Sequence, residues 1–387
     1  MQKAKADSKP VLLWVLASDA FGGAEALSHG CLRELMPHFE IVLLTQEALV
    51  THFSLLDLRI HTFEHEGLNT PHAYNARNMW RYARTIAFVA RQKKADVIHA
   101  VMHNASLFLA LARWLAPLSM RGRRSVGSLH GSLQGFYQSI GRAPSSLERF
   151  AISFTAFTLD KVITPSKGIA HELHSIFRVP KSRLMPIYNG IDLQDVQRRS
   201  CEFRVEKKRE HWIVGCGRLE AQKDFDVLIH AFRAFRLQHK NLPARLVLIG
   251  DGSEKIRLQQ LCVELEIQGA VQFAGFQSNP YPLIAAADVL VLPSRYEGFG
   301  LVLVEAMVLA VPVIASDCPW GPGEIIENGE SGLLFQVGHA EQLASRLEQV
   351  LLNTELAARL SKAGQARAEF FQIARMAEEY AKAFLQN

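Results

Sequence analysis

Two glutamates bracket a glycine-rich turn in the second half of the sequence. The stretch from Pro293 to Met307 reads PSRYEGFGLVLVEAM, with Glu297 before the glycines and Glu305 inside an apolar segment. We predict a helix that begins near Phe299 and carries Glu305 about six residues in, roughly 9 Å along its axis. A buried helix excludes an ionised carboxylate unless a partner compensates its charge. Each glutamate therefore needs a partner.

Two kinds of partner fit the spacing of these glutamates. Gly298 and Gly300 free the backbone, and the N–H groups and dipole at the start of the helix favour an anion. A diphosphate, a pentose and a hexose have dimensions comparable to the spacing, so ligand hydroxyls at both ends of a nucleotide sugar are one solution. The alternative is that Glu297 caps the helix and Glu305 pairs with a basic group of the core.

A second loop carries two cations and follows an apolar run. It extends from Gly215 to Lys223 and contains Arg218. Arginine offers a planar fork to phosphate oxygens, and lysine offers a mobile point charge. The two cations are either a phosphate clamp or solvated surface charges.

A third stretch lies near the start of the chain. In Asp19–Glu25, the adjacent Gly22 and Gly23 allow backbone N–H groups to approach an anion at a helix N-terminus. The pattern is not the GxGxxG fingerprint of dinucleotide sites, and a plain tight turn is the alternative.

Short apolar runs alternate with helical patterns along the whole chain. Runs that are apolar on both faces are typical of parallel strands covered by helices. We predict strands at 11–17, 41–45, 58–63, 96–100, 125–129, 161–164, 184–188, 212–216, 245–249, 271–274, 289–292, 313–315 and 332–335. Predicted helices between them include Glu25–Met36, Asn78–Lys93 and Phe225–His239. A βαβα pattern that runs twice predicts two doubly wound α/β domains.

The boundary between these domains is expected in a polar segment near Leu193–Arg209. Residues 194–200 and 206–210 are polar and charged, as exposed linkers are; a surface helix inside one domain is the alternative. We predict a first domain at 1–195, a second at 196–369, and an amphipathic helix at 370–387 that crosses back to the first domain.

Composition agrees with a folded protein of this size and limits its partners. The chain has 387 residues, a net charge of +5 and 49% hydrophobic residues. This charge is too weak to indicate nucleic acid, but it suits anionic substrates or an anionic membrane face. Five scattered cysteines indicate a reduced, cytoplasmic protein. The polar first ten residues predict no signal peptide, and no apolar run reaches transmembrane length.

Basic residues alternate with large apolar ones in part of the first domain. Such material suits loose attachment to the inner face of the cytoplasmic membrane, and an ordinary helix with a solvated face is the alternative. The residues are Arg77, Arg81, Arg84, Arg91, Lys93 and Lys94 with Trp80, Ile86, Phe88 and Val89, and then Arg113, Arg121, Arg123 and Arg124 with Trp114, Leu115 and Leu118.

These motifs, in this order, resemble the family-4 retaining glycosyltransferases of GT-B fold, in which two Rossmann-like domains face a central cleft. Glu297 and Glu305 reproduce the E-x7-E signature of that family. The resemblance runs through FGGAE at Phe21–Glu25, DVIHAVMHNA at Asp96–Ala105, SLHGS at Ser128–Ser132, VITPSKGIA at Val162–Ala170, IYNGID at Ile187–Asp192, GRLEAQKD at Gly217–Asp224, LVLIGDG at Leu246–Gly252, and Val291–Asp317.

The resemblance implies a role for each residue of the second domain's cluster. Arg218 and Lys223 would neutralise the diphosphate of the donor. Glu305 would bind the ribose hydroxyls, and Glu297 would contact the donor sugar. The backbone that holds the sugar and phosphates would be that of Gly298, Phe299, Gly300 and Leu301.

In the first domain, the resemblance implies that Gly22 and Gly23 approach the diphosphate and that His130 lies beside the transferred sugar. No cofactor is implied; the nucleotide sugar is a co-substrate, with UDP as the expected carrier because it is the commonest in the family. No DxD-type metal motif stands out, which suits metal-independent chemistry. His99 and His103 follow a strand end, so we do not predict a metal pair there.

One position departs from the family pattern. The family usually has glycine where Ala310 stands, before Val311 and Pro312. Glycine there would end the helix in left-handed geometry, and alanine in that conformation costs about 1 kcal/mol. We therefore expect a slightly different helix exit and no loss of activity.

The resulting expectation is a retaining glycosyltransferase. It would move a hexose or N-acetylhexosamine from a nucleotide sugar to a glycan or lipid-linked saccharide in surface polysaccharide or lipopolysaccharide assembly. The segment Asp317–Ile325 resembles a subset of the family that builds surface glycans on lipid carriers. The alternative is a sugar-nucleotide epimerase or isomerase on the same two-domain architecture, which binds the donor but needs no acceptor.

Overall fold

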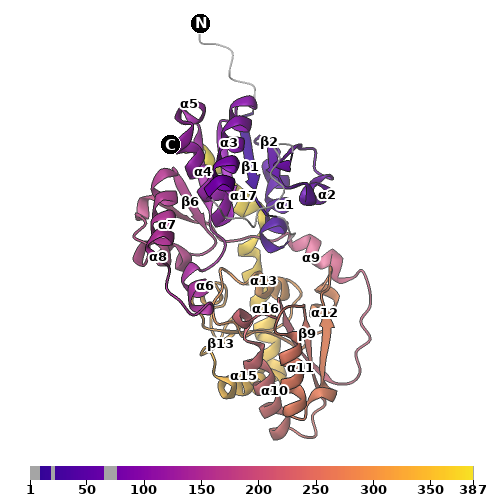
Figure 1. Ribbon diagram of the computed structural model, residues 1–387. Coiled ribbons are helices and arrows are strands. Elements are labelled where there is room, and N and C mark those ends of the chain that lie inside the picture. The colour runs from indigo at the N-terminus through magenta and orange to yellow at the C-terminus, as the bar shows by residue number, and fades with distance from the viewer. Residues whose placement is uncertain (1–8, 19–21, 65–75, 387) are drawn as a thin grey trace. The chain divides into compact units, whose positions relative to one another are not determined.

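The computed structural model describes residues 9–18, 22–64 and 76–386 of the chain (Figure 1). The polar start of the chain and residues 19–21 of the first glycine loop lie outside the described residues. The chain divides into two compact units. The first unit comprises residues 1–131, 143–189 and 373–387, and the second comprises 132–142 and 190–372.

The first unit is built on a parallel sheet of seven described strands in the order β3-β2-β1-β4-β5-β6-β7. Its strands are β1 (Val11–Leu16), β2 (Glu40–Thr45), β3 (Arg59–Thr62), β4 (Val97–Val101), β5 (Arg124–Ser128), β6 (Lys161–Thr164) and β7 (Leu184–Pro186). Its helices are α1 (Gly23–Leu35), α2 (Val50–Phe53), α3 (Ala76–Gln92), α4 (Met102–Leu115), α5 (Pro117–Met120), α7 (Ser146–Thr158), α8 (Lys167–Ser175) and α17 (Ile373–Leu385), with 3-10 turns η1 (Glu47–Leu49) and η3 (Lys181–Arg183).

The second unit repeats this plan with a parallel sheet of six described strands in the order β10-β9-β8-β11-β12-β13. Its strands are β8 (His211–Cys216), β9 (Ala244–Ile249), β10 (Val271–Gly275), β11 (Val289–Leu292), β12 (Val313–Ser316) and β13 (Leu333–Phe335). Its helices are α6 (Leu133–Ser139), α9 (Leu193–Ser200), α10 (Phe225–Gln238), α11 (Lys255–Glu264), α12 (Tyr281–Ala285), α13 (Leu301–Val308), α14 (Pro322–Ile325), α15 (Ala340–Leu352) and α16 (Thr354–Ala368), with 3-10 turns η4 (Ala221–Lys223), η5 (Gln268–Ala270) and η6 (Glu369–Phe371).

The predicted strands are all present, with ends shifted by at most two residues. They form because their side chains are buried on both faces: β4 and β11, for example, are buried at every position. In each sheet the strand order reverses beside the first strand, between β1 and β4 and between β8 and β11. This is the doubly wound order of Rossmann-like folds, so the predicted α/β fold class is confirmed for each unit.

Two local predictions were wrong, and a third was shifted by two residues. Residues 194–200, predicted as an exposed linker, form the helix α9, which begins after an Asp192 side chain that accepts from the Asp195 N–H at 3.0 Å. The helix predicted to begin near Phe299 is present and begins two residues later, at Leu301, and Phe299 is buried. Ala310 adopts the left-handed conformation, with φ of 58°, so the helix exit is the one that glycine would make.

The hydrogen bonds at this exit form a Schellman motif. The Val311 N–H donates to the Ala306 carbonyl at 3.0 Å, and the Ala310 N–H donates to the Met307 carbonyl at 3.1 Å. These bonds satisfy carbonyls that the end of α13 would otherwise leave unpaired. They explain why the chain holds an alanine in a conformation that alanine disfavours.

Candidate functional site

The reversal of strand order in the second unit brings two loops to one edge of the sheet. β8 ends at Cys216 and is followed by the loop with Arg218 and Lys223, and the neighbouring β11 ends at Leu292 and is followed by the loop with Glu297. Ligands of open parallel sheets bind at the carboxyl ends of strands where the order reverses. The two candidate loops therefore meet where such a site is expected.

Glu297 has a protein partner in this structure, and the partner is Lys223. The Lys223 Nζ lies 2.5 Å from Glu297 Oε1, and the Ser294 hydroxyl donates to the same oxygen at 2.6 Å. The two side chains of the ion pair are 15% and 7% exposed. Such a nearly buried pair is strongly coupled, because water screens it little.

The alternative in which Glu297 caps the helix is wrong. The N-cap of α13 is Gly300, with φ of 100°, a backbone conformation that glycine adopts without strain. Gly300 has no side chain to cap the helix, so the N–H groups of the first turn, from Leu301 on, have no side-chain acceptor at this position. This leaves the helix N-terminus suited to an anion.

Hydrogen bonds between the two loops fix the Lys223–Glu297 pair. The Arg295 N–H donates to the Gln222 carbonyl at 2.9 Å, and the Gln222 side-chain amide donates to the Tyr296 carbonyl at 3.0 Å. An ion pair of 2.9 Å joins Arg295 to the buried Asp224. The loops thus form one structure rather than two independent segments.

The absence of a side chain at Gly217 leaves space for the Lys223 side chain. Its φ is 154°, and a Cβ at this position would lie 3.3 Å from Lys223 Cε. The aliphatic part of Lys223 therefore runs directly over the backbone of Gly217 toward Glu297.

Arg218 differs from Lys223 in its surroundings. Its side chain is exposed, and it makes no hydrogen bond or ion pair with another described residue. Its charge lowers the pKa of Glu220, after the larger effect of hydrogen bonds from Ser253. The guanidinium is thus available to an anionic ligand at the same loop.

Glu305 lies half-buried on α13. Burial raises the pKa of its carboxyl to about 7, and the charges of Arg199 and Lys223 act against this rise. Burial and the nearby Glu305 raise the pKa of the Cys216 thiol to about 12, so this cysteine is uncharged. The charges of these two basic groups offset part of the cost of burying the Glu305 carboxylate.

Sequence reasoning missed several residues around this cluster. Ser294 and Gln222 lie within the two stretches analysed in the sequence. The group that each side chain binds depends on how the two loops fold. Arg199 lay in the predicted linker; the Asp192 and Asp195 spacing before apolar Val196 was the signal for a helix there.

The first unit has a different kind of site at its own strand reversal. The Gly22 N–H donates to Glu25 Oε2 at 3.0 Å, and the Ser18 hydroxyl donates to Glu25 Oε1 at 2.5 Å. An anion that takes the Gly22 N–H must therefore displace this carboxylate. Gly22 and Gly23 are exposed, and a Cβ at Gly23 would meet nothing within 4 Å.

His130 follows β5 and is held by a short contact within the strand end. Its Nε2 lies 3.0 Å from the Ser128 hydroxyl, and its Nδ1 is buried without a hydrogen-bond partner among the described residues. Burial lowers the pKa of His130 to about 4. The ring is therefore neutral at physiological pH.

His99 is a core residue. It is fully buried, and its ring lies 4.4 Å from that of Trp14 and 5.4 Å from that of Tyr380. Burial lowers its pKa to about 3. In the described part of the chain, no group of three or more His, Cys, Asp or Glu is placed to hold a metal ion.

Two family models match most of the chain. The model described as Glycosyltransferase Family 4 matches residues 21–195, and the one described as Glycosyl transferases group 1 matches residues 198–367. The second match includes the Lys223, Glu297 and Glu305 cluster, and the first includes His130.

Characterised relatives agree with these matches. The chain is 30% identical over 286 residues to N-acetyl-alpha-D-glucosaminyl L-malate synthase of Bacillus anthracis, covering 71% of this chain and 70% of that protein. It is 28% identical over 241 residues to a Campylobacter jejuni enzyme, N-acetylgalactosamine-N,N'-diacetylbacillosaminyl-diphospho-undecaprenol 4-alpha-N-acetylgalactosaminyltransferase. That match spans 62% of this chain and 64% of the relative. These relatives give no support to the alternative of an epimerase.

A solved structure shares the fold over nearly the whole length. Anabaena HepE in complex with UDP matches with a TM-score of 0.74 and 21% identity, covering 97% of this chain and 99% of HepE. This likeness confirms the two-domain α/β architecture of the GT-B type.

Proposed function

Because the chain belongs to the group 1 and family 4 glycosyltransferases, we propose that it transfers a hexose or N-acetylhexosamine from a nucleotide sugar, with retention of anomeric configuration. The expected carrier is UDP, and the acceptor is a saccharide or a lipid-linked saccharide. The observation that carries this proposal is the cluster at the strand reversal of the second unit, where a nearly buried Lys223–Glu297 pair lies beside the exposed Arg218.

The difficult step in such a transfer is the departure of the nucleoside diphosphate. The bond between the anomeric carbon and the diphosphate oxygen breaks, the acceptor hydroxyl forms a new bond to that carbon, and the hydroxyl proton is lost. Fixed cations and helix N–H groups aimed at the developing charge stabilise the leaving group. Arg218, Lys223 and the N–H groups of Gly298, Phe299, Gly300 and Leu301 are assigned this role.

The two glutamates are assigned to the uncharged parts of the donor, which are the ribose and the sugar. Glu305 accepts hydrogen bonds from the ribose hydroxyls, and Glu297 accepts them from the donor sugar. In the absence of donor, Lys223 satisfies Glu297, so the diphosphate must share this ammonium group with the carboxylate. A lysine can do so because its three N–H donors point in different directions.

The proposal extends to the first unit through His130. Its neutral ring has no charge to offer a phosphate, so His130 is assigned to the uncharged sugar. Gly22 and Gly23 are assigned to the diphosphate, with Glu25 displaced from the Gly22 N–H when the donor binds.

A lipid-linked acceptor is supported by the name of the Campylobacter relative, which specifies a diphospho-undecaprenol substrate for that enzyme. We extend this acceptor class to the present chain, with assembly of surface polysaccharide or lipopolysaccharide as the setting. No helix in the described residues is long and apolar enough to cross a bilayer. Because the lipid of such an acceptor lies in a bilayer, we propose that the protein contacts the membrane surface.

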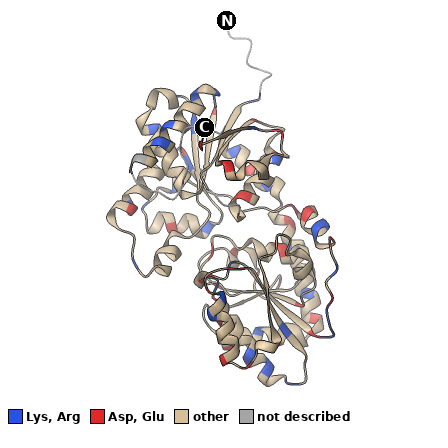
Figure 2. Ribbon diagram, turned by 45° about the vertical axis from the view of Figure 1, so that its right-hand side comes forward, with Lys and Arg blue, Asp and Glu red and all other residues tan. Residues whose placement is uncertain are grey.

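The first unit offers a face for such contact. Trp80 and Phe88 of α3, Trp114 of α4 and Leu118 of α5 are exposed, the last two by 68% and 86%. The exposed Arg81, Arg84 and Arg91 lie on α3, which packs on α4 and α5, and Figure 2 shows Lys and Arg on these helices. The exposed Arg121 directly follows α5. Ile86 and Val89, predicted as part of this face, are instead buried in the core.

Anionic vesicles test this face. Replacing Trp114 and Leu118 by aspartate is expected to abolish sedimentation with vesicles that contain anionic lipid, because apolar area and positive charge both contribute to binding. Leu352→Asp, at an exposed position of α15 in the second unit, is the matched control. Equal sedimentation of both variants, or none by the wild-type protein, would exclude this surface.

Donor screening followed by product analysis tests the function itself. A thermal-shift screen against nucleotide sugars is expected to select one donor, and incubation with that donor and a saccharide acceptor is expected to yield a longer saccharide. The product must depend on the acceptor. An isomerised donor formed without acceptor would contradict the proposal.

A further inference from the structure

A cavity of about 290 Å³ lies at the carboxyl end of β12 in the second unit. It is lined by residues of the segment 317–324, which runs from the end of β12 into α14. β12 lies beside β11 in the sheet, and parallel neighbours end at the same edge. The cavity is therefore at the same edge as the loop that carries Glu297, and the proposed function assigns it no role.

Two contacts fix the wall of this cavity to the Glu297 loop. The Glu297 N–H donates to the Pro319 carbonyl at 3.1 Å. Gly321 lies against the backbone of Phe299, since a Cβ on Gly321 would be 2.2 Å from the Phe299 carbonyl oxygen. Burial, and then the charge of nearby Glu297, raise the pKa of the Cys318 thiol to about 12, so this part of the wall is uncharged. The cavity thus adjoins the candidate site and is held to it by the backbone.

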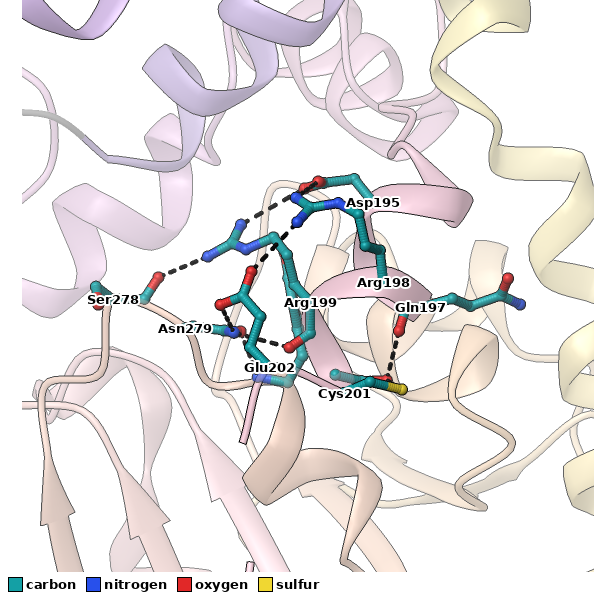
Figure 3. A network of polar contacts seen from close by, with 10 residues as sticks. Asp195, Gln197, Arg198, Arg199, Cys201, Glu202, Ser278 and Asn279 are labelled. Atoms are coloured by element: carbon teal, nitrogen blue, oxygen red, sulfur yellow. Dashed lines mark hydrogen bonds and ion pairs between the residues drawn. The ribbon is translucent and has the colours of Figure 1, made fainter. Parts of the chain in front are cut away.

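The loop after β10, at the same edge of the sheet, has its polar groups occupied within the protein. Arg199 Nη2 of α9 donates to the Ser278 carbonyl at 2.8 Å, and Asn279 Nδ2 donates to the Arg199 carbonyl at 2.8 Å (Figure 3). The Asp317 side chain is different: it is exposed, and its carboxylate makes no hydrogen bond or ion pair with a described residue. Gly323 leaves the space beside it open, because a Cβ there would lie 3.2 Å from Asp317 Oδ1.

The lining of the cavity suits an uncharged ligand that is rich in hydroxyl groups. Asp317 and Glu324 bring negative charge, which opposes a phosphate, whereas the cations Arg218 and Lys223 belong to another loop. Carboxylate oxygens accept hydrogen bonds from hydroxyl groups, and the indole of Trp320 supplies apolar surface. A sugar ring has hydroxyls at its edge and C–H groups on its faces, so it matches both kinds of lining.

We propose that this cavity is a subsite for one uncharged sugar ring, a hexose or N-acetylhexosamine. In it, Asp317 accepts hydrogen bonds from sugar hydroxyls, and Trp320 packs against C–H groups of the ring. The inference rests on the proposed function and adds residues that determine which sugar is accepted. The ring belongs either to the donor, whose sugar is assigned to Glu297, or to the acceptor.

Two substitutions act on the cavity directly. Asp317→Ala removes the acceptor, and Gly323→Leu fills the space beside it. Both positions are exposed, and Gly323 does not have the positive φ that would require glycine, so both variants are expected to fold. Trp320→Phe keeps an aromatic ring, and Trp320→Ala removes it. The matched control is Glu330→Ala, at an exposed position of the same unit outside the cavity lining.

The experiment is calorimetric titration of the full chain with UDP, UDP-glucose, UDP-galactose, UDP-N-acetylglucosamine and UDP-N-acetylgalactosamine, followed by a transfer assay with the donor that binds. UDP has no sugar, so the change in its Kd separates the sugar from the rest of the donor. If the ring is that of the donor, Asp317→Ala and Gly323→Leu are expected to weaken UDP-sugar binding about tenfold and to leave the Kd of UDP within about twofold.

If the ring is that of the acceptor, both Kd values are expected to stay the same, and the KM for the acceptor is expected to rise about tenfold in the same two variants. Whichever of these two constants changes, Trp320→Phe is expected to stay closer to wild type than Trp320→Ala. Glu330→Ala is expected to stay within about twofold of wild type throughout.

The outcomes separate the subsite from a structural effect. Equal weakening of UDP and UDP-sugar binding would show a merely structural role and would overturn the inference. Wild-type values of the donor Kd and the acceptor KM in Asp317→Ala and Gly323→Leu would also overturn it, while the proposed function would stand. If the wild-type protein binds no nucleotide sugar and transfers none, the proposed function fails and the inference fails with it.

Discussion

The two units share a strand order but fill their strand reversals with opposite chemistry. In the first unit burial keeps His99 and His130 neutral, and the Glu25 carboxylate is held by the Ser18 hydroxyl and the Gly22 N–H. In the second unit the polar groups are Lys223, Glu297 and Glu305, which carry or compensate charge. One topology thus carries neutral imidazole rings in one unit and cations in the other, so the cations that stabilise a leaving diphosphate are assigned to the second unit.

The largest expected effect comes from removing the buried cation of the second unit. Lys223→Ala is expected to reduce turnover by about two orders of magnitude or more, because it removes charge stabilisation of the leaving group. Arg218→Ala is expected to have an effect of the same order. Lys255→Ala, which removes a partly exposed lysine at the start of α11 that pairs with Asp251, is the control in a steady-state transfer assay. Near wild-type turnover in both site variants would contradict the assignment.

The free energy of unfolding should distinguish Lys223 from Arg218, although both alanine substitutions are expected to reduce turnover to a similar extent. Lys223→Ala leaves the Glu297 carboxylate buried without its partner, so the free energy of unfolding is expected to fall by about 2 kcal/mol. The Arg218 side chain is exposed and makes no hydrogen bond or ion pair with a described side chain. Arg218→Ala is therefore expected to leave the free energy of unfolding unchanged. Urea unfolding measures both. Adding Glu297→Gln to Lys223→Ala should restore part of the loss; equal stability of the two single variants would show that the ion pair is weak.

The histidines of the first unit should make the protein less stable in acid. Their pKa values in the folded protein lie below the ordinary value of 6.5, so the unfolded chain binds protons that the folded chain refuses. The two neutral histidines therefore make their full contribution to the free energy of unfolding above about pH 6.5, and this contribution is lost as pH falls toward about 4. His130→Gln is expected to reduce this slope in unfolding experiments across that range, and an unchanged slope would mean that His130 is protonated when folded.

Glu305 should produce the opposite pH dependence in the second unit. Burial raises its pKa from 4.5 to about 7, so the unfolded chain releases this proton first and stability is lost as pH rises through that window. Glu305→Gln is therefore expected to raise the melting temperature more at about pH 8 than at about pH 5. The same shift at both pH values would contradict the raised pKa.

The smallest effect concerns the backbone at the end of α13. Ala310→Gly is expected to stabilise the protein by about 1 kcal/mol, because glycine adopts the left-handed conformation without cost. Turnover is expected to be unchanged. Ala358→Gly, at an exposed position inside α16, is expected to destabilise the protein by about 1 kcal/mol. A destabilised Ala310→Gly would mean that the Schellman exit does not depend on this conformation.

The sequence predicted the strands well because buried parallel strands need continuous apolar runs, and such runs are visible without a structure. It also placed Lys223, Glu297 and Glu305, since each follows a predicted strand end or lies in a marked motif. Their pairing was not predictable. Whether Glu297 faces a ligand, a helix end or Lys223 depends on how two loops that are 74 residues apart fold together.

The role of α9 was missed for a related reason. The charged residues of α9 indicated a linker, because composition predicts solvent exposure. It does not predict the few hydrogen bonds that this helix makes to a distant loop. Arg199 meets Ser278 across 79 residues of sequence, and no local pattern encodes that contact. Gly22 was likewise predicted as an anion-binding turn, although Glu25 three residues later already takes its N–H.

A crystal structure of the protein soaked with UDP tests the central claim most directly. We predict that the diphosphate contacts Arg218, Lys223 and the N–H groups at the start of α13, with the ribose hydroxyls on Glu305. A diphosphate bound elsewhere, with the Lys223–Glu297 pair undisturbed and Arg218 unoccupied, would contradict it.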